Sequence, residues 1–189
     1  MSNRIGQHTE IQKTNLYNPN LDGIMSMIGN FLQVTRTELD EYLKDSSLLE
    51  NRIHNEESED DPKLISIDKA WHGILFLLTG QGFGNYDHPL SKIFFSGQTI
   101  DDNQDLGFGP GRYLTPEQVK ELNIEIAEIS TDELKSRYDA KKMTAMKIYP
   151  DDAWEVDGMV DYLTQYFQIV QQVFSEATKN DEAIIAFVN

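Results

Sequence analysis

The sequence has no cysteine among its 189 residues. Disulfides, a thiolate nucleophile and cysteine-ligated zinc are therefore excluded, and the absence fits a reducing cytoplasm. The amino-terminal segment is polar and lacks the apolar stretch of a signal peptide. The longest apolar run, residues 74–78, is far shorter than the ~20 residues that a membrane helix needs. We therefore expect a soluble, cytoplasmic protein.

Basic residues are also scarce, since 16 Lys and Arg stand against 32 Asp and Glu, for a formal net charge of -16. Such a surface repels nucleic-acid phosphates and anionic lipid head groups, so neither nucleic acid nor a membrane is expected as a partner. It would attract a basic protein. Bacterial cytosolic proteins are, however, often acidic without such a partner. Two acidic stretches, residues 55–62 and 101–105, are predicted to be solvated loops.

The pattern of apolar residues predicts one domain over residues 25–189. Residues 1–24 have no clean periodicity and are expected to be a tail, or an extension before an internal start at Met25. The remainder predicts an α+β or α/β fold, with one small mixed sheet of about four strands covered by five or six helices. The predicted strands are residues 27–34, 92–97, 112–114 and 183–188.

Helix starts are indicated by local capping patterns. Thr35 with Glu38 and Thr115 with Gln118 match the capping box, in which two side chains satisfy free backbone groups. A long helix after Asp157 carries apolar residues at spacings of three and four. The most apolar helix is predicted over residues 67–79, with Ser66 as its N-cap, and should be buried on most sides.

Familiar catalytic motifs are missing. The glycine-rich stretch 80–84 follows a helix, whereas a dinucleotide-binding loop follows a strand. The stretch 107–111 lacks the Gly-Lys-Ser/Thr ending of a P-loop. Turns with positive φ explain both more simply. No nucleophile elbow or zinc-binding helix is present, and we expect no cofactor and no metal.

One polar pair suggests chemistry on the predicted helix 67–79. Asp68 and His72 are four residues apart and would share a helix face, with Lys69 nearby and Trp71 on the opposite side. A carboxylate can hold an imidazole in one tautomer, as catalytic bases require. The alternative, which we favour, is structural: Asp68 would stabilise the helix N-terminus and His72 would bind a backbone carbonyl.

Arg112 is the second candidate, because it lies between a glycine-rich turn and a short strand, next to Tyr113. A buried Arg could clamp a carboxylate or a phosphate through two hydrogen bonds. It could equally pair with one of the many acidic residues of the chain, such as Asp105, and this structural interpretation is narrowly preferred.

Several of these stretches resemble the YfbM-like family of bacterial proteins. They are residues 27–34, residues 67–80 with the Trp-His pair, residues 107–117 with the sequence Gly-Pro-Gly-Arg-Tyr-Leu, residues 143–150 and the last helix-strand unit. The resemblance covers residues 25–189 and implies a compact α/β or α+β domain. It supplies no activity, cofactor or catalytic residue. The candidate binding residues that fall inside its motifs are Asp68, Lys69, Trp71, His72, Arg112 and Tyr113, although Trp71 and Tyr113 would also suit a core.

Two functions are compatible with these observations. The first, which we favour, is a non-enzymatic interaction protein, immunity-like or accessory, that meets a basic partner. The second is an enzyme or small-ligand binder with a pocket around Asp68, His72 and Arg112 that receives a small anionic ligand. The sequence indicates neither the substrate nor the oligomeric state.

Overall fold

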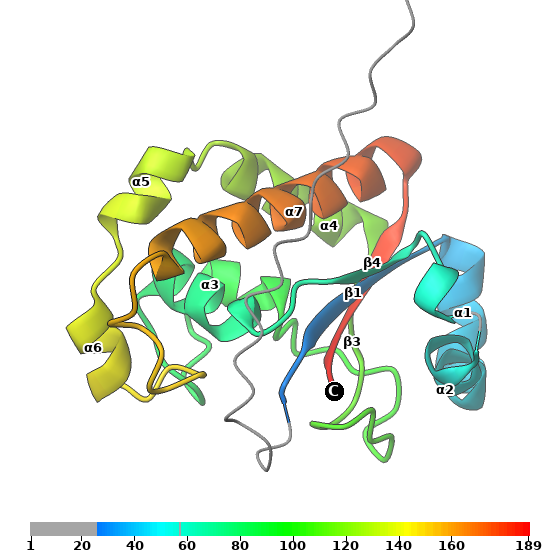
Figure 1. Ribbon diagram of the computed structural model, residues 1–189. Coiled ribbons are helices and arrows are strands. Elements are labelled where there is room, and N and C mark those ends of the chain that lie inside the picture. Colours follow the sequence, from blue (N-terminus) through cyan, green and yellow to red (C-terminus); the bar gives the residue numbers. More distant parts are fainter. Residues whose placement is uncertain (1–25, 57) are drawn as a thin grey trace, which may run out of the picture.

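The structure, a computed structural model, describes residues 26–56 and 58–189 (Figure 1). The predictions about residues 1–24 and about a start at Met25 lie outside this described part. Four strands form one sheet in the order β2-β1-β4-β3. They are β1 (Gly29–Val34), β2 (Leu64–Ser66), β3 (Arg112–Leu114) and β4 (Ala183–Val188). Every pairing is antiparallel, so the predicted mixed sheet is wrong. The predicted α+β class is confirmed.

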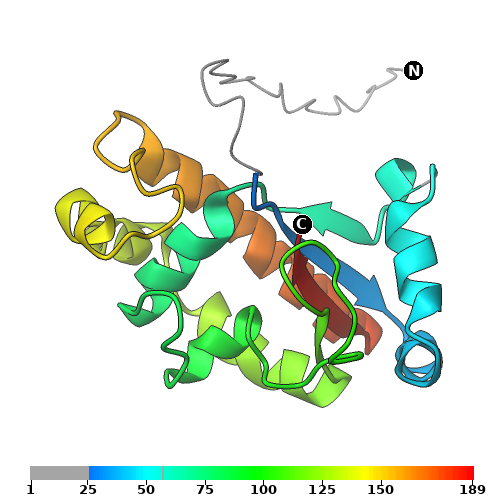
Figure 2. The same ribbon diagram turned by 90° about the horizontal axis from the view of Figure 1, so that it is seen from below.

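Seven α-helices surround the sheet in the described residues, where five or six were expected. They are α1 (Arg36–Lys44), α2 (Ser47–His54), α3 (Ala70–Thr79), α4 (Pro116–Ala127), α5 (Thr131–Ser136), α6 (Ala140–Ala145) and α7 (Met159–Asn180). Figures 1 and 2 show α3, α4 and α7 on one side of the sheet and α1 with α2 on the other. None of the described helices is both long and apolar enough to span a membrane.

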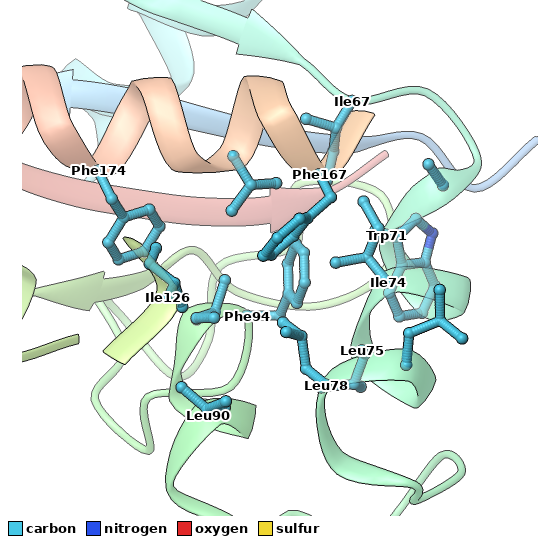
Figure 3. Close-up of a cluster of buried hydrophobic side chains, with 14 of the residues drawn as sticks. Ile67, Trp71, Ile74, Leu75, Leu78, Leu90, Phe94, Ile126, Phe167 and Phe174 are labelled. Atoms are coloured by element: carbon cyan, nitrogen blue, oxygen red, sulfur yellow. The ribbon is translucent and has the colours of Figure 1, made fainter. Parts of the chain in front are cut away.

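Both faces of the sheet carry a hydrophobic core, which explains the continuous apolar run of β4. Ile184 and Ala186 face the larger core with α3, α4 and α7, whereas Ile185 and Phe187 face the smaller core with α1 and α2. Figure 3 shows the larger core, in which Trp71, Ile74, Phe94, Phe167 and Phe174 are among the labelled side chains. Side chains alternate across a strand, so a strand covered on both faces is apolar at every position.

One predicted strand is absent, and one strand of the sheet was not predicted. Residues 92–97 form no strand, because residues Pro89–Ile93 form a 3-10 helix, η3, and the chain then turns. Ile93 and Phe94 are buried in the larger core, so an apolar run of this kind does not require a strand. The strand that sequence reasoning missed is β2, which is three residues long and half-buried at the sheet edge.

The apolar helix α3 starts at Ala70, three residues later than predicted, and Ser66 belongs to β2 rather than to a cap. The reason lies in the sheet, because residues before the helix still bond to β1. The Ile67 N–H donates to the Gly29 carbonyl at 2.9 Å, and the Gly29 N–H donates to the Asp68 carbonyl at 3.0 Å. Nine of the ten residues of α3 are buried, as its composition predicted.

Candidate functional site

Asp68 lies ahead of α3, in a left-handed conformation with φ of 51°. Its carboxylate faces α7 and accepts a hydrogen bond from the Tyr162 hydroxyl at 3.1 Å. Burial, together with the charge of Asp68, raises the pKa of Tyr162, so this hydroxyl stays protonated. The Asp68–Tyr162 bond therefore connects the start of α3 to α7. Lys69, the next residue, forms no ion pair with another described residue.

His72 is enclosed in the protein, with only 2% of its surface exposed. Its Nδ1 accepts a hydrogen bond from the Tyr149 backbone N–H at 2.9 Å, so the ring proton of the neutral form is on Nε2. That Nε2 is buried and has no hydrogen-bond partner among the described residues. Burial lowers the pKa of His72 to about 4, so the ring is neutral near pH 7.

The Asp68–His72 pair suggested by the helical spacing does not form, and His72 accepts a backbone N–H rather than binding the backbone carbonyl that the favoured structural interpretation expected. Asp68 precedes the helix and bonds to α7, whereas His72 bonds to the segment that contains Tyr149. A general base needs a free lone pair within reach of its substrate. The accepting nitrogen of His72 is already occupied by Tyr149, so the ring is a buried hydrogen-bond acceptor that positions this segment.

The rings around His72 form an aromatic cluster. His72 stacks on Trp71 at a centroid distance of 4.9 Å, and the Phe83 ring stands edge-on to it at 6.0 Å. The cluster extends to Phe95, whose centroid is 6.2 Å from that of Trp71. Its members are Trp71, His72, Phe83, Tyr86, Phe95 and Tyr149. Phe83 is 71% exposed, so one end of the cluster reaches the surface.

Arg112 contacts the same cluster. Its guanidinium lies 5.1 Å from the centroid of Phe95, as in a cation–π contact, and donates to the Pro110 carbonyl at 3.3 Å. The expected pairing with Asp105 is absent, since that carboxylate accepts the N–H groups of Gly107 and Gly109, both at 3.0 Å. The structure thus connects Arg112 to Trp71 and His72 through Phe95.

Tyr113 does not belong to this group. It follows Arg112 on β3, and alternate residues of a strand face opposite sides of the sheet. Tyr113 packs against the smaller core together with Leu64, whereas Leu114 faces the larger one. Of the six candidates, Trp71, His72 and Arg112 are brought together, and Asp68, Lys69 and Tyr113 are not.

The described surface includes two hollows that none of the six candidates lines. The first has a volume of about 870 Å³ and lies between the end of α3, His88 and the α5–α6 segment. The second, of about 360 Å³, lies between Tyr138, α6 and the residues ahead of α7. The lining of the first is Phe76, Leu77, Leu78, Thr79, Gly80, His88, Ser136, Arg137, Tyr138, Asp139, Ala140, Lys141 and Lys142.

Basic side chains at the first hollow were missed by sequence reasoning. Five of the 16 Lys and Arg residues fall between residues 135 and 147, and Asp139 is the one acidic residue in that segment. This local charge is opposite in sign to that of the whole chain, and it was the signal available in the sequence. The local excess of basic residues indicates a site only when the fold shows that α6 lies beside the end of α3.

Acidic side chains gather at the opposite end of the molecule. The Ser46 hydroxyl bonds to the Asp101 carboxylate at 2.9 Å, and the Gln104 amide bonds to the Ser46 carbonyl at 2.9 Å and to Glu50 at 3.3 Å. The predicted acidic loop 101–105 therefore packs on the first turn of α2. We call the following residues the acidic end: Asp40, Glu41, Asp45, Glu50, Asp101, Asp102 and Asp105. In residues 26–56 and 58–189, no group of three His, Asp or Glu side chains is arranged to hold a metal.

Comparisons with known proteins identify the family and the fold. A family model described as "Domain of unknown function (DUF1877)" matches residues 25–187. The crystal structure of a protein of unknown function, YfbM from Escherichia coli, is similar with a TM-score of 0.68 and 16% identity, over 86% of this chain and 100% of that one. The resemblance inferred from the sequence is thus confirmed. A search of curated proteins found no match.

Proposed function

The chain belongs to the DUF1877 family of domains of unknown function, and from that premise we propose that it is an interaction protein, immunity-like or accessory, whose acidic end binds a basic protein partner. The observation that carries this proposal is the joining of two acidic segments about 60 residues apart, through the Ser46–Asp101 contact. None of the seven carboxylates of the acidic end forms an ion pair within the described residues. Their charge is therefore available to a partner.

Two carboxylates of the acidic end, Asp101 and Asp105, have a lowered pKa. Hydrogen bonds from the Asn103 backbone and the Ser46 hydroxyl lower the pKa of Asp101. The N–H groups of Gly109 and Gly107 do the same for the pKa of Asp105. Both carboxylates belong to a loop that is held by several hydrogen bonds, so they are presented in a fixed arrangement, which supports selective rather than diffuse attraction.

Apolar side chains are exposed within the same region. Leu43 on α1 and Leu48 on α2 are 40% and 43% exposed. Charges at the edge of an interface steer a partner, whereas apolar side chains that become buried supply binding energy. A basic partner with its own apolar surface would meet both kinds of group here. Lys44 is the opposing charge in this region, since Arg52 is engaged by Glu38 and Asp61.

The alternative function, an enzyme or small-ligand binder around Asp68, His72 and Arg112, has less support. Asp68 and His72 point to different partners, and His72 is enclosed. The observation that still favours it is that Arg112 is half-buried and has no carboxylate partner in the described residues.

A cytoplasmic location, inferred from the cysteine-free sequence, belongs to the proposal as well.

The test compares two variants that lose the same number of charges in different places. The first changes Asp40→Asn, Glu41→Gln, Asp101→Asn and Asp102→Asn at the acidic end. The control changes Glu121→Gln, Glu125→Gln, Glu128→Gln and Asp132→Asn, which are exposed on α4 and α5. Proteins retained by each immobilised form from an extract of the native cell are identified, and the affinity of each purified candidate is then measured.

We expect a basic protein that binds the wild type and the control alike, and binds the acidic-end variant at least about tenfold more weakly, which corresponds to about 1.4 kcal/mol. Equal weakening by both variants would mean that only the net charge matters. That outcome would contradict a specific acidic surface.

A further inference from the structure

The first hollow lies at the pole of the molecule opposite the acidic end, and its chemistry differs from that of the rest of the surface. Figures 1 and 2 show α6 at one end and α1 with α2 at the other. Three basic residues, Arg137, Lys141 and Lys142, and one acidic residue, Asp139, line this hollow in a chain with a net charge of -16. A positive site on a negative protein attracts anions that the remaining surface repels.

We propose that this hollow binds a small anionic molecule that carries a phosphate group on an apolar or aromatic body. Its volume of about 870 Å³ falls within the range of roughly 300 to 1,000 Å³ that is common for small-molecule sites. A phosphate would meet the lysines, and the apolar body would meet the half-buried Tyr138 and Ala140. The α3 residues Phe76, Leu77 and Leu78 of the lining are at most 3% exposed, so they offer little surface to a ligand. The site is independent of the acidic end and of the function proposed for it.

Two lysines supply the free positive charge. Lys141 and Lys142 line the hollow, are exposed, and form no ion pair with another described residue. The Lys142 ammonium lies 5.4 Å from the centroid of Phe76, within the range of a cation–π contact, and it has no carboxylate partner among the described residues. Lys141 also lines the second hollow, so it stands between the two.

The remaining polar groups make the wall rigid. Arg137 donates to the Leu77 carbonyl at 3.2 Å and to the Glu133 carboxylate at 2.5 Å, which fixes the α5–α6 segment against the end of α3. The Asp139 carboxylate is engaged by the Lys142 N–H at 3.0 Å, as the cap of α6. The Nδ1 of His88 accepts the Leu90 N–H at 3.1 Å, which leaves its Nε2 as a hydrogen-bond donor when the ring is neutral.

The class of ligand follows from this arrangement. Mobile ammonium groups bind a phosphate as point charges. The two positive charges of Lys141 and Lys142 match the charge of a phosphate better than the single negative charge of a carboxylate. The apolar surface of Tyr138 and Ala140 in the lining favours a ligand with an apolar part over inorganic phosphate alone. A nucleic acid is disfavoured, because its extended backbone would meet the acidic surface outside the hollow.

Phenyl phosphate and inorganic phosphate are the probes for the test, and amide chemical shifts of the full chain report binding. Phenyl phosphate should produce saturable shifts in residues 76–80, 88 and 136–142, at lower concentrations than inorganic phosphate. The double variant Lys141→Gln, Lys142→Gln should weaken binding of phenyl phosphate by about tenfold or more. Both lysines are exposed, so this variant should keep the wild-type pattern of amide shifts elsewhere.

A second double variant, Lys92→Gln with Lys147→Asn, is the matched control. It removes the same charge from exposed positions outside the lining, and Asn tolerates the left-handed φ of 53° at residue 147. We expect unchanged binding in the control. Equal weakening in both variants, shifts spread over the whole surface, or equal affinity for the two probes would overturn the proposal. So would much tighter binding of a tyrosine-phosphorylated peptide, which would point to a protein ligand.

Discussion

His72 contributes to stability as a neutral ring, and its burial makes that contribution depend on pH. Protonation would have to place a charge in the core beside Trp71 and break the bond in which Nδ1 accepts the Tyr149 N–H. The pKa of about 4 in the folded protein is below the ordinary value of 6.5. Between these values the unfolded chain binds more protons than the folded protein, so stability falls as the pH falls.

We predict that the wild type loses about 2 kcal/mol of unfolding free energy through His72 alone between about pH 7.5 and about pH 5. The variant His72→Gln, which keeps an acceptor for the Tyr149 N–H and has no ionisable ring, should lack this loss. Urea unfolding of both proteins at the two pH values measures it. The variant is expected to be less stable at the higher pH, with the gap narrowing at the lower one.

A constant gap between the two proteins would contradict this prediction, because it would mean that His72 does not titrate differently in the folded and unfolded states. The other three histidines are present in both proteins, so any contribution they make cancels in the comparison.

At the level of single residues, local spacing did not predict how the candidate residues are arranged. Trp71, His72 and Arg112 do meet at one aromatic cluster. The helical spacing that paired Asp68 with His72 failed, because Asp68 still bonds to β1 through its carbonyl and has a positive φ. A bond between strands distant in sequence is not visible in local spacing, so the start of α3 could not be read from periodicity.

At the level of elements, the packing of α3 against α7 and the preceding loop depends on a glycine. A Cβ atom added at Gly73 would lie 2.6 Å from Trp154 Cη2 and 2.7 Å from Leu163 Cδ2. Both neighbours are fully buried and have little room to move. We predict that Gly73→Ala destabilises the protein by about 2 kcal/mol, although alanine favours a helix by about 1 kcal/mol. Urea unfolding measures the change.

Gly82→Ala is the matched control for this variant. A Cβ atom there would have Met146 Cε as its nearest neighbour, at 3.4 Å, and this is the flexible end of a side chain. We expect a change within about 0.5 kcal/mol. If Gly73→Ala were as mild as the control, α3 would not be held as tightly against Trp154 and Leu163 as the structure indicates.

Elements with strong local signals were predictable, and those defined by tertiary packing were not. Both capping boxes form as expected, with the Thr35 and Thr115 side chains bonded to their helix starts. The spacing of apolar residues predicted α7, which buries Leu163, Phe167, Val170 and Phe174. Residues 92–97 were misread because apolar side chains also fill a core from a 3-10 helix and a turn. The edge strand β2 is too short to show alternation.

For the whole molecule, charge is both the clearest sequence signal and a cost to folding. The excess of 16 negative charges repels itself in the compact state. The ion pairs that oppose it involve mostly exposed side chains, as in Arg36–Glu117 and Lys120–Asp181, and such pairs contribute little. The composition gives the excess of negative charge, whereas the fold shows that the acidic end and the basic hollow lie at different ends of the molecule.

Screening should therefore stabilise the protein. We predict that raising NaCl from about 0.05 M to about 0.5 M at neutral pH increases the melting temperature by a few degrees, because the Debye length falls below the spacing of the repelling carboxylates. The acidic-end variant, which lacks four of these charges, should gain less in melting temperature from added salt than the wild type. Scanning calorimetry of the two proteins over the salt series measures both effects. A melting temperature that falls with salt in the wild type would mean that attraction within its ion pairs outweighs the repulsion between its carboxylates. The carboxylates of the acidic end would then stabilise the fold and would not be free for a partner.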